Sequence, residues 1–237
     1  MQKIWVCGAR GQIGQAVNDV VDKLEFEMLD TDVDDLDVTD TEEVLRFGEM
    51  NRPDIIINCS GMTDISSCEE NPSQAFKVNA LGARNLAIVA AKMQAKMVQL
   101  STDDVFDGKS TEPYTEFDIT NPGTVYGKSK LAGENYVKEF TTKHFIVRST
   151  WVYGKGQNFI NGFLKKVDAG EQLSIASDQF GSPTSANELA RFLLHLVHTS
   201  EYGTYHATNK GVCSRYAFAQ EILKMTGKTA SMQPVPT

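Results

Sequence analysis

The chain has 237 residues, enough for one large α/β domain or for a domain with a smaller lobe, each with a full hydrophobic core. Its formal net charge of -8 argues against proteins that bind nucleic acid or anionic membranes non-specifically. It contains no apolar run of the roughly 18 residues that a transmembrane helix needs, and its N-terminus lacks the apolar segment of a signal peptide. We therefore expect a cytoplasmic protein that binds neither nucleic acid nor membranes.

Over the first 150 residues, short apolar runs alternate with helix-length amphipathic segments. Strands are predicted at 3–7, 25–29, 55–58, 97–100 and 145–148, and helices at 12–21, 40–50 and 71–94. Asp40 and Glu43 resemble a capping box at the start of the second helix, and Asn71-Pro72 begins the third. The run Ile55-Ile-Ile-Asn58 is unbroken, as in a sheet that is covered on both faces. This order predicts a Rossmann-type, doubly wound parallel sheet with right-handed crossovers.

The pattern becomes less regular after Trp151. Helices are predicted near 158–168, 187–198 and 215–225, with one short strand at 204–207. We accordingly divide the chain into a Rossmann domain at 1–150 and a smaller mixed α/β lobe at 151–237 that partly returns to the main sheet. The Pro-rich end, Gln233–Thr237, shows no pattern of a helix or strand, and we expect the C-terminus to be truncated.

The cysteines, histidines and aspartates do not form a clear metal-binding pattern. The four cysteines contain no C-x-x-C pair, and Cys7 and Cys59 each end an apolar run, where a thiol usually fills space in the core. The four histidines are scattered, without carboxylates or thiolates at ligand spacing. Five aspartates crowd the segment after the second strand, where a solvated surface is the simpler interpretation and a metal site stays an alternative: Asp32, Asp34, Asp35, Asp37 and Asp40. We predict no protein-built metal site.

A glycine-rich turn joins the first predicted strand to the first predicted helix. Its spacing is Gly8-x-x-Gly11-x-x-Gly14, which differs from the general G-x-G-x-x-G of dinucleotide-binding folds. Gly8 can form the tight turn, Gly11 lets the backbone approach a pyrophosphate at the helix N-terminus, and Gly14 allows the helix to pack closely on the strand. We interpret the turn as a dinucleotide-binding site, with a plain tight turn as the alternative.

An acidic residue in the second strand should hold the ribose of the adenosine half. Asp30 lies at the required distance, about 20 residues after the first glycine. A carboxylate there favours NADH, because it would repel the 2′-phosphate of NADPH. Arg10, inside the glycine turn, could offset this preference, so the sequence leaves the choice between NADPH and NADH open.

Tyr126 and Lys130 are four residues apart, which places them on one face of a helix. A cation beside the phenol stabilises the phenolate and lowers the tyrosine pKa, so we expect Tyr126 to donate a proton to a developing alkoxide. Thr102 ends the fourth predicted strand, at the edge of the sheet where ligands of such folds bind, and its hydroxyl can hydrogen-bond a substrate carbonyl. A helix cap built by Ser101, Thr102 and Asp103 is an equally good interpretation of that segment.

Together these features resemble the extended branch of the short-chain dehydrogenase/reductase superfamily, which acts on nucleotide sugars. Four segments narrow the resemblance to the dTDP-4-dehydrorhamnose reductase family: Ser101-Thr-Asp-Asp-Val-Phe-Asp-Gly108, Pro122-Gly-Thr-Val-Tyr-Gly-Lys-Ser-Lys-Leu-Ala-Gly-Glu134, Arg148-Ser-Thr-Trp-Val-Tyr-Gly154 and Asp178-Gln-Phe-Gly-Ser-Pro-Thr184. It extends from the first strand to Thr237. The resemblance implies an oxidoreductase that reduces dTDP-4-dehydro-6-deoxy-L-mannose to dTDP-L-rhamnose with NADPH or NADH.

The resemblance also implies roles for particular residues. Tyr126 would donate a proton to the 4-keto oxygen, Lys130 would adjust the phenol and contact the nicotinamide ribose, and Thr102 would orient the keto oxygen. For the cofactor, it places Gly11, Gln12 and Ile13 against the pyrophosphate, Asp37 and Val38 against the adenosine half, and Gly61, Met62 and Thr63 along the central part. Thr102, Asp103 and Trp151 would meet the dTDP-linked 4-keto deoxysugar. Domain 1–150 would bind NAD(P), and lobe 151–237 the substrate. Core packing is the other interpretation of Trp151.

The chain departs from the family in two respects. The family usually reads Ser-Thr-Asp-Tyr where this chain has Asp104, which removes an aromatic side chain from the sugar-side wall and adds an anion near a diphosphate substrate. Family members also continue past 233–237. Two alternatives stay open: a reductase of another nucleotide-linked 4-keto deoxysugar, and a non-catalytic regulatory subunit similar to that of methionine adenosyltransferase. The sequence does not fix the oligomeric state, and a homodimer is the assembly that we consider.

Overall fold

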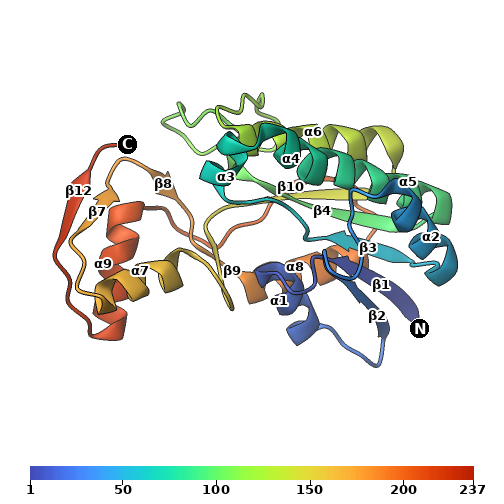
Figure 1. Cartoon of the computed structure of the whole chain (residues 1–237), viewed down its shortest axis with the longest axis horizontal. Coiled ribbons are helices and arrows are strands. Elements are labelled where there is room, and N and C mark those ends of the chain that lie inside the picture. The colour runs from blue at the N-terminus through green and yellow to red at the C-terminus, as the bar shows by residue number, and fades with distance from the viewer.

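The computed structural model describes all residues, 1–237, and is built around a six-stranded sheet (Figure 1). The strand order is β10-β5-β4-β3-β1-β2, and every neighbouring pair is parallel. The strands are β1 (Gln2–Cys7), β2 (Phe26–Thr31), β3 (Ile55–Asn58), β4 (Lys96–Thr102), β5 (His144–Ser149) and β10 (Gly203–His206). The predicted Rossmann-type parallel sheet is therefore confirmed.

Helices cover both faces of the sheet (Figure 1). One face carries α1 (Gln12–Val20) and α8 (Ala186–Val197), and the other carries α2 (Thr41–Asn51), α5 (Ala83–Met93) and α6 (Val125–Phe140). Successive side chains of β3 point to opposite faces, so Ile55 and Ile57 pack in the core beside α1 and α8, whereas Ile56 packs in the core beside α2 and α5. This two-sided burial is the reason why the apolar runs of the strands are unbroken.

The long helix predicted at 71–94 is a helical run of three parts. The α4 helix (Pro72–Phe76) leads into η1 (Lys77–Gly82), a π-helical segment, and η1 leads into α5. A short helix that the sequence did not predict, α3 (Ile65–Glu70), precedes them. Its cap is the carboxylate of Asp64, which accepts a hydrogen bond from a backbone N–H in the first turn.

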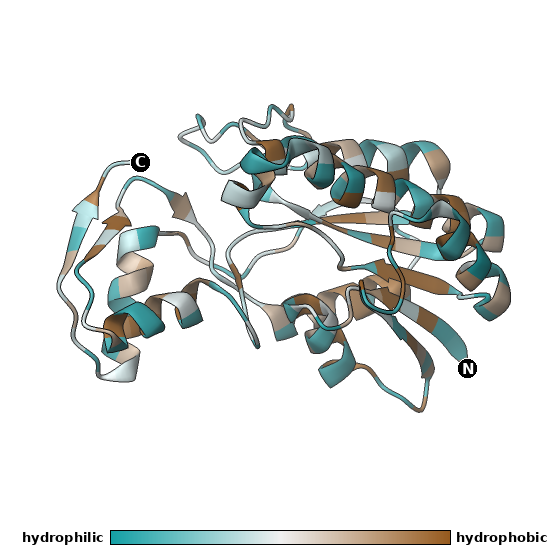
Figure 2. Cartoon of the chain, in the orientation of Figure 1, coloured by the Kyte–Doolittle hydropathy of each residue, from teal (hydrophilic) through white to brown (hydrophobic).

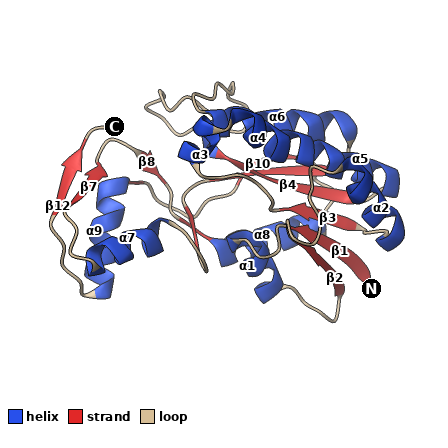
Figure 3. Ribbon diagram, viewed as in Figure 1, coloured by secondary structure: helices blue, strands red, loops and turns tan.

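After β5 the chain builds a smaller lobe, at the left of Figure 1. The lobe contains two helices, α7 (Phe159–Asp168) and α9 (Arg215–Thr226). Three short strand pairs accompany them: β7 (Leu173–Ala176) with β12 (Met232–Val235), β8 (Phe180–Gly181) with β11 (Cys213–Ser214), and β6 (Val152–Tyr153) with β9 (Thr184–Ser185). Between these pairs the chain returns to the main sheet, where β10 pairs with β5 and α8 packs on α1 (Figure 3).

The prediction that Gln233–Thr237 carries no element is wrong, because the segment enters β12. Met232 lies opposite Leu173 of β7, and Pro234 lies opposite Ile175. Proline is tolerated because β12 has a partner on one side only. The strand is specified by pairing with a segment that is distant in the sequence, so the short run itself has no periodic pattern.

Buried hydrophobic residues form two cores around the main sheet and a third in the lobe. Figure 2 shows the hydrophobic segments along the strands of the main sheet. The first two contain 20 and 15 buried residues. The third contains five: Phe163, Val167, Leu173, Ala219 and Ile222. The lobe therefore has a small core of its own. No helix has the length and hydrophobicity that crossing a membrane requires.

Candidate active site

The residues singled out by the sequence gather at the carboxyl edge of the sheet. Gly8 follows β1, Gly61 lies shortly after β3, Thr102 ends β4, and Trp151 lies two residues after β5. Tyr126 reaches the same edge from the first turn of α6. Ligands of open parallel sheets bind at this edge, so the topology alone brings these side chains to one place.

The glycine turn is shaped by close backbone contacts. Gly8 has φ +77°, and a Cβ atom on it would lie 2.8 Å from the Ser60 backbone nitrogen. A Cβ atom on Gly14 would lie 2.4 Å from the Gly8 carbonyl oxygen. Both glycines are therefore required by backbone atoms that cannot move away easily. The Gly11 position is less crowded, with 3.2 Å to the Gly8 carbonyl oxygen.

The N-terminus of α1 fits the pyrophosphate of a dinucleotide cofactor. Gly11 is the N-cap, no side chain caps the helix, and no acidic residue lies in its first turn. The first-turn N–H groups of Gln12, Ile13 and Gly14 therefore face an open, electropositive helix end. In addition, Oε1 of Gln12 is buried without a hydrogen-bond partner, while its Nε2 donates to the Val152 carbonyl oxygen at 3.0 Å. An unpaired buried acceptor beside an uncapped helix end fits a bound ligand, so the residues present fit an NAD(P) cofactor.

The residues predicted for the adenosine half are partly engaged with the protein. Asp30 is exposed within β2, beside Val6 of β1. Arg10 forms ion pairs with Asp34 and Asp35, at 3.3 and 3.0 Å. These two carboxylates therefore already pair with the guanidinium that was expected to offset the repulsion between Asp30 and a 2′-phosphate.

Asp37 and Val38 follow on the same side of the sheet. The Asp37 side chain is exposed and accepts a hydrogen bond from the Thr39 N–H at 2.8 Å. Val38 is buried, and its carbonyl oxygen accepts a hydrogen bond from Asn85 at 3.0 Å. The structure therefore leaves Asp37 the freer of these two residues, and the choice between NADH and NADPH stays open.

Thr102 and Tyr126 lie side by side at the end of β4. The Thr102 hydroxyl donates to Oδ1 of Asp103 at 3.1 Å and accepts from the Asp104 N–H at 3.2 Å, which begins the 3-10 turn η2 (Asp103–Val105). The cap interpretation of this segment is thus correct, and the same hydroxyl also hydrogen-bonds the Tyr126 phenol. One threonine therefore ends the strand and contacts the predicted acid.

The expectation that Lys130 lowers the pKa of Tyr126 is wrong for this arrangement. Burial raises the pKa of Tyr126, the Thr102 hydrogen bond opposes this, and the carboxylates of Asp104 and Asp103 raise it further. The physical reason is that the phenol is desolvated and lies near the carboxylates of Asp104 and Asp103, whereas Lys130 is not among the charges that shift its pKa. Tyr126 is therefore neutral, which is the protonation state that an acid needs before it donates.

Lys130 is a buried cation beneath the loop that follows β3. A Cβ atom on Gly61 would lie 3.7 Å from its Nζ. Burial lowers the pKa of Lys130 to about 8, while the negative charge of the Glu134 carboxylate acts in the opposite direction. The interpretation of the two cysteines as core residues agrees with the structure: Cys7 is fully buried, and Cys59, near this lysine, packs against the core beside α1 and α8.

Asn79 anchors the loop of Gly61, Met62 and Thr63, and the sequence analysis missed it. Its Oδ1 accepts from the Met62 N–H at 2.8 Å, and its Nδ2 donates to the Met62 carbonyl oxygen and to Ser129 Oγ, each at 2.9 Å. Ser129 lies on α6 between Tyr126 and Lys130. The π-helical η1 segment thus fixes the loop to the helix that carries both predicted catalytic side chains, and a functional site often accompanies such a segment.

A second missed group, Glu134 with Arg148, fixes α6 to the sheet. The fully buried Glu134 carboxylate accepts from Nε and Nη2 of Arg148 at 2.9 and 2.7 Å, and from Ser101 Oγ at 2.6 Å. The bidentate contact with Arg148 and the hydrogen bond from Ser101 satisfy most of the hydrogen-bonding capacity of the two carboxylate oxygens. The sequence signal was a charged residue, Arg148, inside an otherwise apolar strand.

Trp151, the residue expected to meet the substrate, lies two residues after β5. It has φ +46°, unusual for a bulky residue, and Gly181 packs so closely that a Cβ atom there would lie 2.7 Å from Cε2 of the indole. The guanidinium of Arg215, a residue that the sequence analysis did not single out, lies 3.7 Å from the centroid of the indole ring. Asp103 lies next to this segment, because its carboxylate accepts a hydrogen bond from the Thr150 hydroxyl at 2.5 Å.

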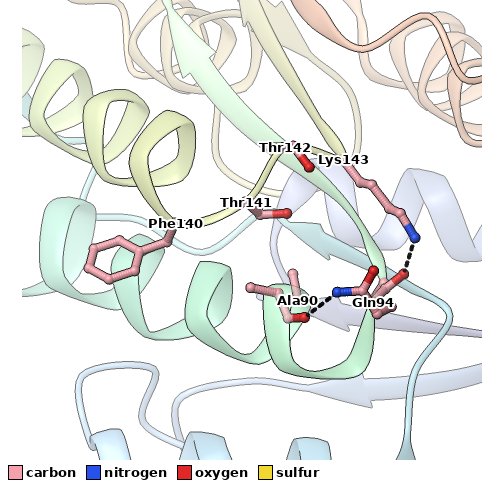
Figure 4. Close-up of a pocket in the computed structure, with 8 residues that line it drawn as sticks. Ala90, Gln94, Phe140, Thr141, Thr142 and Lys143 are labelled. Atoms are coloured by element: carbon pink, nitrogen blue, oxygen red, sulfur yellow. Dashed lines mark hydrogen bonds between the residues drawn. The ribbon is translucent and has the colours of Figure 1, made fainter.

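A pocket elsewhere on the molecule does not share this chemistry. It lies between the end of α5 and the end of α6, where Lys143 Nζ donates to the Gln94 carbonyl oxygen at 3.1 Å (Figure 4). Gln94 precedes β4, so the pocket is at the opposite edge of the sheet from Thr102. No group of three or more His, Cys, Asp and Glu side chains is arranged to hold a metal ion anywhere in the chain.

Comparison with known proteins gives the family. The model of the RmlD substrate binding domain matches residues 1–237. Curated relatives include the spore coat polysaccharide biosynthesis protein SpsK of Bacillus subtilis, 35% identical over 100% of this chain and 84% of its own length. The dTDP-4-dehydrorhamnose reductase of Aggregatibacter actinomycetemcomitans is 32% identical over 100% and 83%, and the dTDP-4-keto-6-deoxy-D-glucose reductase of Streptomyces niveus is 34% identical over 98% and 82%.

Solved structures agree with this assignment. A dTDP-4-dehydrorhamnose reductase from Clostridium acetobutylicum superposes with a TM-score of 0.97 at 43% identity, covering 100% of this chain and 84% of that one. The dTDP-4-dehydrorhamnose reductase of Bacillus anthracis in complex with NADP also has a TM-score of 0.97, at 38% identity, over 100% and 85%. The chain belongs to the RmlD substrate binding domain family.

Proposed function

We propose that the protein is a dTDP-4-dehydrorhamnose reductase, which reduces the 4-keto group of dTDP-4-dehydro-6-deoxy-L-mannose to give dTDP-L-rhamnose with NADPH or NADH. The observation that carries the proposal is the contact of Thr102 with Tyr126 at the sheet edge that also holds the uncapped start of α1. Relatives with the same printed activity, and a related structure in complex with NADP, support it. Domain 1–150 then holds the cofactor, and lobe 151–237 supplies much of the sugar-side wall.

In this proposal the 4-keto oxygen accepts hydrogen bonds from the hydroxyls of Thr102 and Tyr126. When bound, a nicotinamide cofactor would supply the hydride for the carbonyl carbon. As negative charge develops on the oxygen, Tyr126 transfers its proton there, because an alkoxide is a stronger base than a phenolate. Lys130, one helical turn away on α6, would contact the nicotinamide ribose of the bound cofactor. Asn79 holds the loop of Gly61 and Met62 next to this lysine.

The test measures oxidation of NADPH and of NADH when the 4-keto sugar nucleotide is added. Wild type should consume cofactor, and Tyr126→Phe should lower kcat by about 10²- to 10⁴-fold, the usual contribution of a positioned acid. Tyr136→Phe is a matched control, because Tyr136 is also a partly buried tyrosine of α6 but packs against Phe140. Equal rates for wild type and Tyr126→Phe would rule out this mechanism. Binding of cofactor without turnover by wild type, together with a stable co-purifying enzyme, would instead support a regulatory subunit.

A second candidate keeps the chemistry and changes the sugar. Asp104 and Arg215 bring a carboxylate and a guanidinium close to the proposed substrate site. Such a pair favours a sugar whose hydroxyl groups can hydrogen-bond both charges. A panel that includes dTDP-4-keto-6-deoxy-D-glucose, the substrate named for the Streptomyces niveus relative, separates the two candidates by kcat/KM. The homodimer stays a prediction that light scattering can test.

A further inference from the structure

Asp104 and Arg215 are two charged residues that come from different parts of the fold. Asp104 belongs to η2, directly after Thr102, whereas Arg215 begins α9 in the smaller lobe. Each alters the ionisation of the other: the cation opposes the rise in the pKa of Asp104, and both Asp103 and Asp104 oppose the fall in the pKa of Arg215. The geometry also places them in one region: Arg215 stacks on Trp151, and the hydroxyl of Thr150, the neighbour of Trp151, donates to Asp103, the neighbour of Asp104.

The Asp104 carboxylate is available for a ligand. Asp103 beside it is already engaged, since its two oxygens accept hydrogen bonds from Thr102 and Thr150. Asp104 uses its backbone N–H in the turn, but its partly buried side chain is influenced by charge and burial only, not by any hydrogen bond. Burial raises its pKa to about 6, so it is largely ionised at neutral pH. A half-buried carboxylate without a hydrogen-bond donor is poorly solvated.

Arg215 is held in place while its N–H groups stay free. Its guanidinium packs 3.7 Å from the centroid of Trp151 and 5.0 Å from that of Phe159. Its backbone N–H donates to the Gln179 carbonyl oxygen at 3.0 Å, and Ser214 caps the helix. As with Asp104, only burial and nearby charges influence the side chain. Stacking on aromatic faces leaves the donors at the edge of a guanidinium open to a ligand.

A hydroxyl group matches this pair, and a phosphate does not. A hydroxyl can donate its proton to a carboxylate and at the same time accept from a guanidinium. A diphosphate would gain from Arg215 but would be repelled by the carboxylates of Asp103 and Asp104. Because Asp104 is two residues from Thr102, which takes the keto oxygen in the proposed reaction, the hydroxyl should be on a carbon next to the carbonyl.

We propose that Asp104 and Arg215 together bind the 3-hydroxyl of the sugar, next to the 4-keto group, and thereby set the preference among 4-keto sugars. The proposal rests on the proposed function. It makes Arg215 a substrate-binding residue contributed by the smaller lobe. Binding of the hydroxyl would then connect η2 with the smaller lobe through the substrate.

The experiment compares kcat/KM for dTDP-4-dehydro-6-deoxy-L-mannose and for its 3-deoxy analogue. Asp104→Asn and Arg215→Met should each lower kcat/KM for the hydroxylated sugar by about 10- to 100-fold, the effect of losing a charged hydrogen bond. For the 3-deoxy sugar, the same variants should equal wild type. Arg215→Met retains an apolar stem against Trp151, and Arg191→Met, at an exposed arginine of α8, is the matched control. The double variant should lose less than the two single losses combined, because both residues act on one hydroxyl.

Three results would overturn the proposal. An equal loss on both sugars would mean a structural role, and no loss on the hydroxylated sugar would mean that the pair does not contact it. Wild type that neither reduces nor binds the dTDP sugar would reject the proposed function, and this inference with it. Cofactor fluorescence in each variant separates these outcomes from misfolding, because NADPH binding should stay at the wild-type level in all of them.

Discussion

The two buried cations of the site, Arg148 and Lys130, differ in how closely a carboxylate pairs with them. Arg148 forms a bidentate ion pair with Glu134, whereas Lys130 makes no hydrogen bond with a carboxylate and feels Glu134 only through space. The positive charge of Lys130 is therefore stabilised less in the folded protein than it would be in water. The fold therefore retains Lys130 at a cost in stability, as is common for residues that serve a reaction.

The pH dependence of stability follows from Lys130. Its pKa of about 8 in the folded protein lies below the ordinary value of 10.5, so the unfolded chain binds more protons between these values. Stability should therefore rise with pH across that window, and the cost of the charge should be fully present below about pH 8. Lys130→Met should remove the rise and add up to about 3 kcal/mol to the free energy of unfolding at pH 7.

Urea denaturation at pH 7 and pH 10 checks this expectation. Lys128→Met is the control, because Lys128 is exposed on the same helix. If the two variants were equally stable and showed the same pH dependence, Lys130 would not be the strained charge that its burial indicates. Reductase activity should fall in Lys130→Met alone, so that stability and activity change in opposite directions.

At the scale of elements, the glycine turn and α1 depend on contacts that helix propensity does not describe. Gly14→Ala would ordinarily stabilise a helix, by about 1 kcal/mol. Here the added Cβ would lie 2.4 Å from the Gly8 carbonyl oxygen and 2.6 Å from the Ala9 Cα. Since these are backbone atoms, the turn must shift, and we expect a net loss of about 2 kcal/mol or more together with weaker NADPH binding.

Gly162→Ala provides the matched comparison. Gly162 also lies inside a helix, α7, but nothing is within 4 Å of its Cβ position. It should therefore follow propensity and stabilise the protein by up to about 1 kcal/mol. Thermal denaturation of both variants tests the two expectations. If Gly14→Ala stabilised the protein, the backbone of the glycine turn would be able to shift and make room for the added Cβ atom.

Elements with a local signal were predicted well, and elements that depend on distant partners were not. The strand at 55–58 was predicted with its observed bounds, because burial on both faces leaves an apolar run that can be read in the sequence. By contrast, β12 exists through its pairing with β7, and η1 interrupts a helix whose pattern looks continuous. The same division holds in the site. Tyr126 and Lys130 are related by helix spacing, whereas Asn79 and Arg215 reach the cleft only through the tertiary fold.

At the scale of the whole molecule, the two lobes differ in the size of their cores. The main sheet is enclosed by clusters of 20 and 15 buried residues, and the lobe by one of five. Because free energies of local opening follow the amount of buried apolar contact, the lobe should open more readily than the sheet. It carries Arg215, so its opening should affect the sugar side of the cleft and leave the cofactor side intact.

Ile222→Ala tests this separation. Ile222 is 6% exposed in the core of the lobe, and truncation should cost about 2–4 kcal/mol. Hydrogen exchange should then accelerate in α7 and α9 while the strands of the sheet keep their protection, and the variant should bind NADPH normally but the dTDP sugar weakly. Leu193→Ala, in the core beside α1, should instead lower protection throughout the sheet and weaken both ligands. If Ile222→Ala destabilised the sheet as much as the lobe, the two cores would unfold as one unit, and the lobe could not open around its substrate independently of the cofactor domain.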